Sequence, residues 1–205
     1  MSTPREMWDR RHAEEGFAYG DAPNDFLREV AARLPAGDAV CLAEGEGRNA
    51  VFLAARAGAG RVIAVDQSAV GLEKAAALAR ARGLTLETVV ADLADYTPPA
   101  GVSVVASIWA HVPPAIRAPL HARVVEALRP GGALVLEAYT PAQGGRGTGG
   151  PPAAEAMMTL AALRGELRGL ELAIGRELVR EVHEGRYHAG ESAVVQVLAY
   201  KPGPA

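Results

Sequence analysis

Five short apolar runs alternate with longer amphipathic segments along the first two thirds of the chain. Most of these runs are rich in β-branched residues and lack strict polar–apolar alternation; they occupy 38–43, 61–66, 86–91, 102–108 and 133–139. Such runs are typical of strands that are buried on both faces of a sheet. The alternation therefore predicts an α/β fold, a doubly wound parallel sheet with helices on both faces.

Apolar residues recur at helical spacing between these runs. The spacing of three and four residues predicts helices over 47–58, 68–82 and 114–129. Ser68 has the side chain of an N-cap for the second helix, and Gly83 suits the position just after its end. An earlier helix is expected to begin at the N-cap Asn24 and to continue through Leu34.

The C-terminal third has a different pattern. A helix is predicted over 155–169, followed by two long strands over 170–183 and 187–200. Two strands with so short a connection must be antiparallel. Before them, residues 141–152 contain five glycines and three prolines, a composition that predicts a mobile surface loop rather than a packed element.

Composition narrows the class of protein. A chain of 205 residues suggests one domain, 1–205, and its net charge of −3 gives no reason to expect a nucleic-acid partner. The lone Cys41 indicates a reducing compartment, so a cytoplasmic location is expected. The N-terminus has no apolar signal-like region, and no run of about 18 apolar residues predicts a membrane span.

The loop after the first run contains two glycines and two acids. Gly45, Gly47 and Ala50 fit the G-x-G-x-x-G/A dinucleotide pattern. However, Glu44 and Glu46 stand where a pyrophosphate would lie, and like charges there are unfavourable. A cationic, phosphate-free nucleoside such as S-adenosylmethionine fits the loop better. Whether these glutamates contact a ligand or are solvated loop residues stays open.

Two further acids end the next two runs. Asp66 lies 21 positions after Gly45, where a carboxylate can accept from ribose hydroxyls, although it could instead cap the following helix. Asp92 ends the third run, where it could accept from the exocyclic amine of an adenine or simply cap a loop. A dinucleotide site does not require this third acid.

Four ordered motifs resemble class I S-adenosylmethionine-dependent methyltransferases. They are AEGEGRN (43–49), VIAVDQS (62–68), VVADL (89–93) and ALRPGGALVLE (127–137). The resemblance implies S-adenosylmethionine as cofactor and a Rossmann-like, seven-stranded, mostly parallel sheet in the order 3-2-1-4-5-7-6, with an antiparallel C-terminal strand. It also implies a lid segment over 1–35, a cofactor-binding half over 36–140 and an acceptor-side loop, helix and hairpin over 141–205.

The N-terminal stretch WDRRHAEEGFAYGDAPNDFL (8–27) is similar to the tellurite-resistance and thiopurine methyltransferase-like branch, in which such a segment folds over the cofactor. That branch often has the loop D-x-G-C-G-x-G-R-N. Here Cys41 replaces the acid and Ala43 the first glycine, so Glu44 could supply the missing carboxylate. The cofactor-binding residues expected from motifs and resemblance are Trp8, Tyr19, Glu44, Gly45, Glu46, Gly47, Asn49, Asp66, Gln67, Ser68, Ala91, Asp92, Leu93, Ser107 and Ile108.

Methyl transfer from a sulfonium is an in-line displacement, and a base is needed only when the acceptor arrives protonated. His111 follows the fourth run, and a cluster of basic residues, Arg180, His183, Arg186 and His188, surrounds the last hairpin. From these we select His111, His183 and Arg186 as catalytic candidates, each with a structural alternative. No metal site is expected, because the spacing of His183, Glu184 and His188 matches no known ligand pattern.

The expected acceptor is a small molecule with a soft nucleophile: a thiol, a selenium or tellurium oxyanion, or a heterocycle. The protein is expected to act as a monomer or a homodimer. A non-catalytic S-adenosylmethionine-binding regulator is the main alternative. An NAD-dependent oxidoreductase is a weaker one, because no hydride-transfer constellation is visible.

Overall fold

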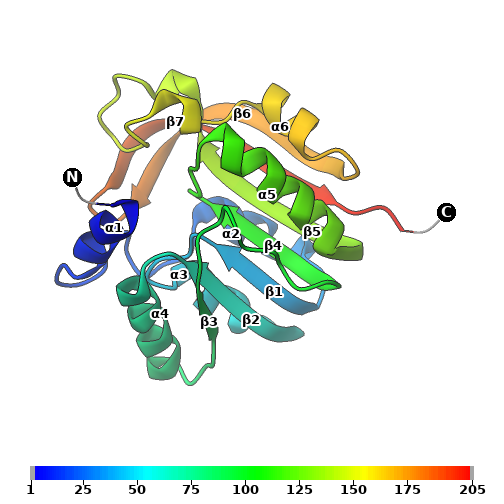
Figure 1. Ribbon diagram of the computed structural model, residues 1–205, viewed down its shortest axis with the longest axis horizontal. Coiled ribbons are helices and arrows are strands. Elements are labelled where there is room, and N and C mark those ends of the chain that lie inside the picture. Colours follow the sequence, from blue (N-terminus) through cyan, green and yellow to red (C-terminus); the bar gives the residue numbers. More distant parts are fainter. Residues whose placement is uncertain (1–2, 204–205) are drawn as a thin grey trace.

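A single seven-stranded sheet forms the centre of the molecule in the computed structural model, which describes residues 3–203 (Figure 1). The strands are β1 (Gly37–Leu42), β2 (Ala59–Asp66), β3 (Glu87–Val90), β4 (Val102–Ile108), β5 (Leu128–Tyr139), β6 (Glu171–Glu184) and β7 (His188–Tyr200). Their order is β3-β2-β1-β4-β5-β7-β6, and β7 runs antiparallel to both of its neighbours. The other neighbouring pairs are parallel, which confirms the predicted fold class and strand order.

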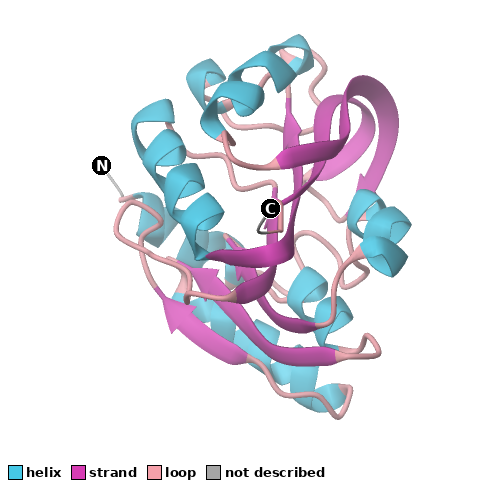
Figure 2. Cartoon of the chain, turned by 90° about the vertical axis from the view of Figure 1, so that its right-hand side faces the viewer, coloured by secondary structure: helices cyan, strands magenta, loops and turns pink. Residues whose placement is uncertain are grey.

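The helices flank this sheet as expected (Figure 2). They are α1 (Pro4–His12), α2 (Asp25–Val30), α3 (Arg48–Ala54), α4 (Ala69–Ala81), α5 (Pro114–Ala127) and α6 (Leu160–Glu166), with short 3₁₀ turns η1 (Ala31–Arg33), η2 (Pro141–Gln143) and η3 (Ala154–Ala156). Two predicted N-caps are confirmed, because Asn24 accepts from the amide of Leu27 and Ser68 from that of Gly71. Gly83 has a φ of +69° just after α4, as a helix-ending glycine should.

Several boundaries differ from the prediction. The helix expected over 47–58 ends at Ala54, because the chain must turn at Gly58, where φ is +76°, before β2 begins. The helix expected over 155–169 is divided into η3 and α6, because Met157 and Thr159 have extended backbones. The helix α1 was not predicted; Thr3 and Glu6 form a capping box that starts it.

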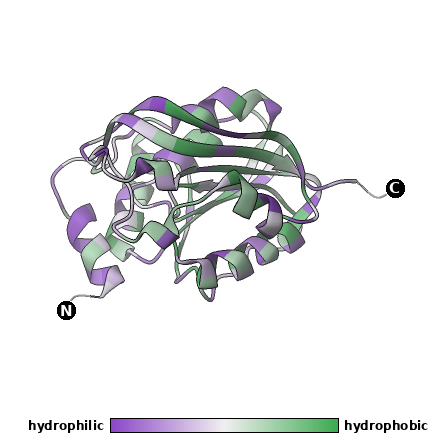
Figure 3. Ribbon diagram, turned by 90° about the horizontal axis from the view of Figure 1, so that it is seen from above, coloured by the Kyte–Doolittle hydropathy of each residue, from purple (hydrophilic) through white to green (hydrophobic). Residues whose placement is uncertain are grey.

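Two hydrophobic cores lie on opposite faces of the sheet. Alternate residues of β1 show this, because Val40 and Leu42 face α5 and α6, whereas Ala39 and Cys41 face α2, α3 and α4. Figure 3 shows the central strands as largely hydrophobic and the helices as a mixture of hydrophobic and hydrophilic residues. Burial on both faces explains why the strand runs in the sequence lack polar–apolar alternation.

The edge strand β3 is an exception to that pattern. β3 lies at the sheet edge and is mostly exposed, and the side chain of Val90 is 49% exposed. The sequence predicted a buried strand here. The reason for the difference is that no helix covers the connection from β3 to β4 within the described residues.

The predicted loop over 141–152 is more ordered than expected. It starts with the turn η2, and the buried side chain of Gln143 donates to the carbonyl of Gly149 and the hydroxyl of Thr148. The side-chain oxygen of Gln143 accepts from the backbone amide of Ala193 in β7. Gln143 thus helps to fasten the loop to the sheet, together with Thr148, whose hydroxyl donates to the carbonyl of Glu191 in β7.

The N-terminal segment lies between α4 and the tip of the β6–β7 hairpin (Figure 1). Gly185 turns the hairpin with a φ of +74°, and a Cβ there would lie 2.4 Å from the carbonyl oxygen of Ala18. The amide of Arg186 donates to that same carbonyl at 2.9 Å. This close approach requires a glycine and holds the segment above the carboxyl ends of the strands. Within residues 3–203, no helix combines the length and the apolar character needed to cross a membrane.

Candidate functional site

A cavity of about 850 Å³ lies at the carboxyl ends of β1, β2, β3 and β4. The loops that follow these strands form its floor. Its roof is formed by α1, the loop over 141–152 and the β6–β7 hairpin. In an open α/β sheet, this edge is where ligands bind. The cavity therefore brings most of the predicted cofactor residues together with part of the predicted acceptor side.

The two loop glycines have different tasks. Gly47 has a φ of +93°, and a Cβ there would lie only 2.5 Å from the Cβ of Ala75, so this glycine lets α3 and α4 pack closely. It does not line the cavity. Gly45 does line it, and a Cβ there would lie 3.0 Å from the ring of His12.

Asp66 sits at the end of β2 and lines the cavity with only 7% of its surface exposed. Its two oxygens accept from the amides of Gly45 at 2.9 Å and Ser68 at 2.8 Å. Burial raises the pKa of this carboxyl. Each oxygen keeps a second lone pair, so the cap that the sequence offered as an alternative leaves acceptor capacity for a ligand.

Asp92 also lines the cavity, and its carboxylate accepts from the amide of Ala94 at 2.8 Å. Unlike Asp66, it is exposed. Four other predicted cofactor residues line the cavity: Gln67, Ala91, Leu93 and Ile108. The predicted residues Ser68 and Ser107 are buried outside the lining; the Ser68 hydroxyl caps α4 and donates to Asp9 of α1 at 2.6 Å.

Neither loop glutamate is a solvated residue. Glu44 accepts from the amides of Asn49 at 2.9 Å and Ala50 at 2.7 Å, and burial raises its pKa to about 7. Glu46 accepts from the amide of Ala18 at 2.7 Å and pairs with Lys74 at 2.9 Å. The net negative charge at the loop is therefore smaller than the sequence suggested, which weakens the argument that it repels phosphate.

Predicted lid residues meet the loop from above. Asn49 accepts from the amide of Asn24 at 2.9 Å, which ties the N-terminal segment to α3. Trp8 stacks on His12 with ring centroids 5.7 Å apart, and the ring of Tyr19 lies 6.3 Å from that of Trp8. The predicted residues Trp8 and Tyr19 thus form an aromatic roof over the cofactor loop.

A second aromatic group forms the other end of the cavity. Trp109 stacks on Tyr139 at 4.4 Å between centroids and lies 4.9 Å from His188, whose ring is 4.7 Å from Tyr19. The Tyr139 hydroxyl and the His188 Nδ1 are buried without a hydrogen-bond partner among the described residues. His188 was part of the noted basic cluster but was not selected from it.

The three catalytic candidates occupy different environments. The Nε2 atom of His111 accepts from the amide of Tyr139 at 2.9 Å, so Nδ1 carries the proton and donates to the Trp109 carbonyl at 3.0 Å. Burial lowers the pKa of His111 to about 4. Both ring nitrogens of His111 therefore form hydrogen bonds to the backbone, which favours a structural role for this residue over a catalytic one. His183 is exposed on β6 outside the cavity, whereas Arg186 lines it and pairs with Glu14 at 2.9 Å.

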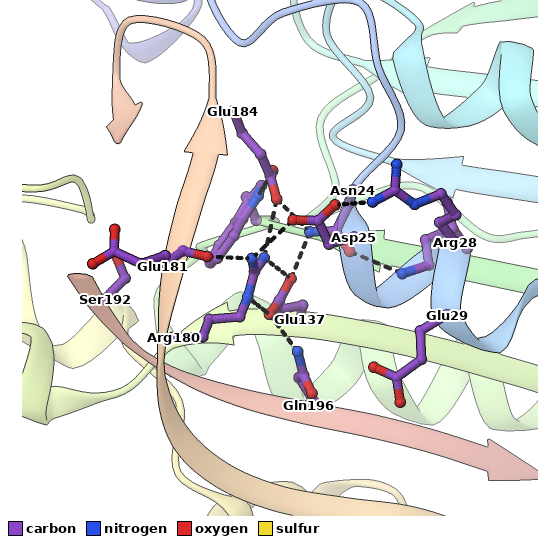
Figure 4. Close-up of polar contacts among 12 residues, drawn as sticks. Asn24, Asp25, Arg28, Glu29, Glu137, Arg180, Glu181, Glu184, Ser192 and Gln196 are labelled. Carbon is purple, nitrogen blue, oxygen red and sulfur yellow. Dashed lines mark hydrogen bonds and ion pairs between the residues drawn. The ribbon is translucent and has the colours of Figure 1, made fainter. Parts of the chain in front are cut away.

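A buried ionic network lies behind the aromatic wall (Figure 4). Arg180 donates to Glu137 at 2.8 Å and to Glu184 at 3.0 Å, and Glu184 also pairs with Arg48. The indole nitrogen of Trp109 donates to Glu184 at 2.6 Å. This contact fixes a residue whose φ of +58° is unusual for a non-glycine. The network thus holds Trp109 in place.

Sequence reasoning missed this network. Asn24 donates to Glu184, 160 positions later in the chain, and to Glu137, 113 positions later. Local spacing carries no signal for such pairs. Arg180 was noted for its charge, and Glu137 lay inside a quoted motif, but nothing in the sequence connected them.

Comparison with known proteins agrees with this architecture. Residues 39–132 match the family model described as a methyltransferase domain. No curated protein sequence matches this chain significantly. The family match covers β1 to β4 and the loops at the floor of the cavity, and it supports S-adenosylmethionine as the cofactor.

Solved structures share the fold at low sequence identity. The structure from a study of the conversion of a disulfide bond into a thioacetal group during echinomycin biosynthesis has a TM-score of 0.77 at 18% identity, over 99% of this chain and 93% of that one. TehB from Haemophilus influenzae has a TM-score of 0.70 at 13% sequence identity, and the match covers 96% of this chain and 66% of that one. The N-methyltransferase NodS from Bradyrhizobium japonicum WM9 in complex with S-adenosyl-L-homocysteine has a TM-score of 0.66 at 14% sequence identity, and the match covers 97% of this chain and 98% of that one. These similarities establish a shared fold.

Proposed function

We propose that this protein transfers a methyl group from S-adenosylmethionine to a soft nucleophile on a small molecule: a thiol, a selenium or tellurium oxyanion, or a heterocycle. The observation that carries the proposal is one continuous cavity with two unlike ends. Asp66 and Asp92 line one end, and Trp109 and His188 line the other. A nucleoside cofactor and a small acceptor can therefore lie side by side in one cavity of about 850 Å³.

The cofactor would lie across the strand ends. Its ribose hydroxyls would donate to the free lone pairs of Asp66, and its adenine amine to Asp92. Its methionine part would then extend past Gly45 beneath Trp8 and Tyr19. Aromatic faces attract a sulfonium through the cation–π effect. Gly45 itself contributes no side chain to this part of the lining.

The chemistry then requires little beyond alignment. A lone pair of the acceptor attacks the methyl carbon, the carbon–sulfur bond breaks, and the sulfonium becomes a neutral thioether. Positioning of this kind can contribute about 7–11 kcal/mol. Burial lowers the pKa of His188 to about 3, although Glu184 opposes this, so His188 and His111 are both neutral near pH 7. An acceptor that ionises in water before it binds, such as a thiol, needs no base from the protein.

We further propose membership of the tellurite-resistance and thiopurine methyltransferase-like branch. The segment 8–27 covers the cavity in the manner expected of that branch, and TehB is among the structural neighbours. Sulfur chemistry appears in the echinomycin study that supplied another neighbour. We also propose that the protein acts in the cytoplasm, as a monomer or homodimer.

Mass spectrometry after incubation with methyl-labelled S-adenosylmethionine tests the activity. The panel would contain aliphatic and aromatic thiols, selenite, tellurite and nitrogen heterocycles. We expect a labelled product from at least one thiol, with S-adenosylhomocysteine formed in equal amount. Binding of S-adenosylmethionine without any labelled product would contradict the proposal and favour a non-catalytic regulator.

A further inference from the structure

Three arginines line the cavity, and they differ in how their charges are balanced. Arg48 pairs with the buried carboxylate of Glu184, and Arg186 pairs with Glu14. Arg11 of α1 forms no ion pair with a carboxylate anywhere in residues 3–203. It is also half-buried, so its charge is only partly hydrated.

Neutral groups hold the Arg11 guanidinium in one orientation. One of its nitrogens donates to the hydroxyl of Tyr19 at 3.0 Å, and its central carbon lies 4.2 Å from the ring centroid of Tyr187 and 5.5 Å from that of Trp8. These contacts orient the plane without neutralising it. A guanidinium has five N–H donors, and only one is used by a side chain here.

The acid whose charge acts on Arg11, Glu14, is already occupied. One oxygen of Glu14 accepts from the Tyr187 hydroxyl at 2.7 Å, and the other pairs with Arg186 at 2.9 Å. The same cavity is lined by the acids at the strand ends, Asp66 and Asp92. The cavity therefore has an acidic side and, at α1, a fixed guanidinium whose charge no side chain balances.

We propose that Arg11 binds the carboxylate of a molecule held in this cavity. A planar guanidinium matches a carboxylate through two parallel hydrogen bonds, which a point charge such as lysine does not reproduce. The inference rests on the proposed function, because that function supplies two sources of the group. They are the methionine carboxylate of the cofactor and a carboxylate on the acceptor.

Calorimetry with two matched ligand pairs tests this. The first pair is S-adenosylhomocysteine and its decarboxylated analogue, which keeps the amine. The second is 2-mercaptobenzoate and thiophenol, each added to the protein saturated with S-adenosylhomocysteine. For the variant Arg11→Gln we expect at least about tenfold weaker binding of the carboxylate-bearing member of one pair, from loss of a charged hydrogen bond, and unchanged binding of its partner.

The pair that responds identifies the source. Arg11→Lys should retain only part of the discrimination, and Arg10→Gln, a change at an exposed neighbour in α1, should retain all of it. Retained binding of the decarboxylated nucleoside shows that a variant is folded. Equal loss for both members, or no loss in either pair, would overturn the role of Arg11. Failure of the unmodified protein to bind either nucleoside would instead overturn the proposed function.

Discussion

The carboxylates at the two ends of the cavity are stabilised in opposite ways. At the cofactor end, Glu44 and Asp66 accept from backbone amides. Behind the acceptor end, Glu137 and Glu184 accept from arginine side chains. Both pairs are buried, so the comparison isolates the kind of partner.

The pKa values show what this difference does. Burial raises the pKa of Glu44 to about 7, because amide dipoles only partly offset the loss of water. Burial would also raise the pKa of Glu184, but Arg48, the Trp109 indole and Arg180 lower it to about 2. The two acids paired with arginines, Glu137 and Glu184, therefore serve to hold the structure together. The amide-paired Asp66 keeps lone pairs and is the carboxylate suited to a sugar.

Removing one charge from the network should have the largest effect. In Glu184→Gln, Arg48 keeps its buried charge but loses its partner, and we expect the free energy of unfolding to fall by about 3–5 kcal/mol. Urea denaturation measures this. Glu191→Gln changes an exposed ion pair and should cost less than about 1 kcal/mol. Equal effects of the two variants would show that the network does not differ from a surface pair.

Glu44 should stabilise the folded state when it is protonated, whereas Glu184 does so when it is charged. Its pKa rises from 4.5 to about 7 on folding, so the folded state binds the proton more tightly. Its contribution to stability is fully present below pH 4.5 and is lost as the pH rises through about 7, by at most about 3 kcal/mol. Unfolding curves from pH 4 to 8 should therefore decline less for Glu44→Gln than for the unmodified protein. Parallel curves would mean that Glu44 is not protonated on folding.

The same comparison explains what the sequence could predict. Asp66, Gly45 and Asp92 follow apolar runs at characteristic spacing, and the strand order brings these strand ends together. Their place in the cavity was therefore foreseeable. So was the cap made by Ser68, because a cap acts on residues next to it.

What escaped prediction depends on distant contacts. The neutral state of His111 requires knowing that Tyr139 donates to it, and the unbalanced charge of Arg11 requires knowing where every acid lies. The exposure of Val90 follows from the position of β3 at the edge of the sheet. None of these has a local signature, since each is decided by which elements pack together.

Calorimetric titration of S-adenosylhomocysteine into the unmodified protein and Asp66→Asn tests the central claim most directly. If the ribose donates to the free lone pairs of Asp66, the variant should bind about 10–100-fold more weakly, as for loss of a hydrogen bond to a charged group. Asp95→Asn changes an exposed acid outside the cavity lining and serves as the matched control. Equal affinities of all three proteins would contradict the claim that the nucleoside lies against Asp66.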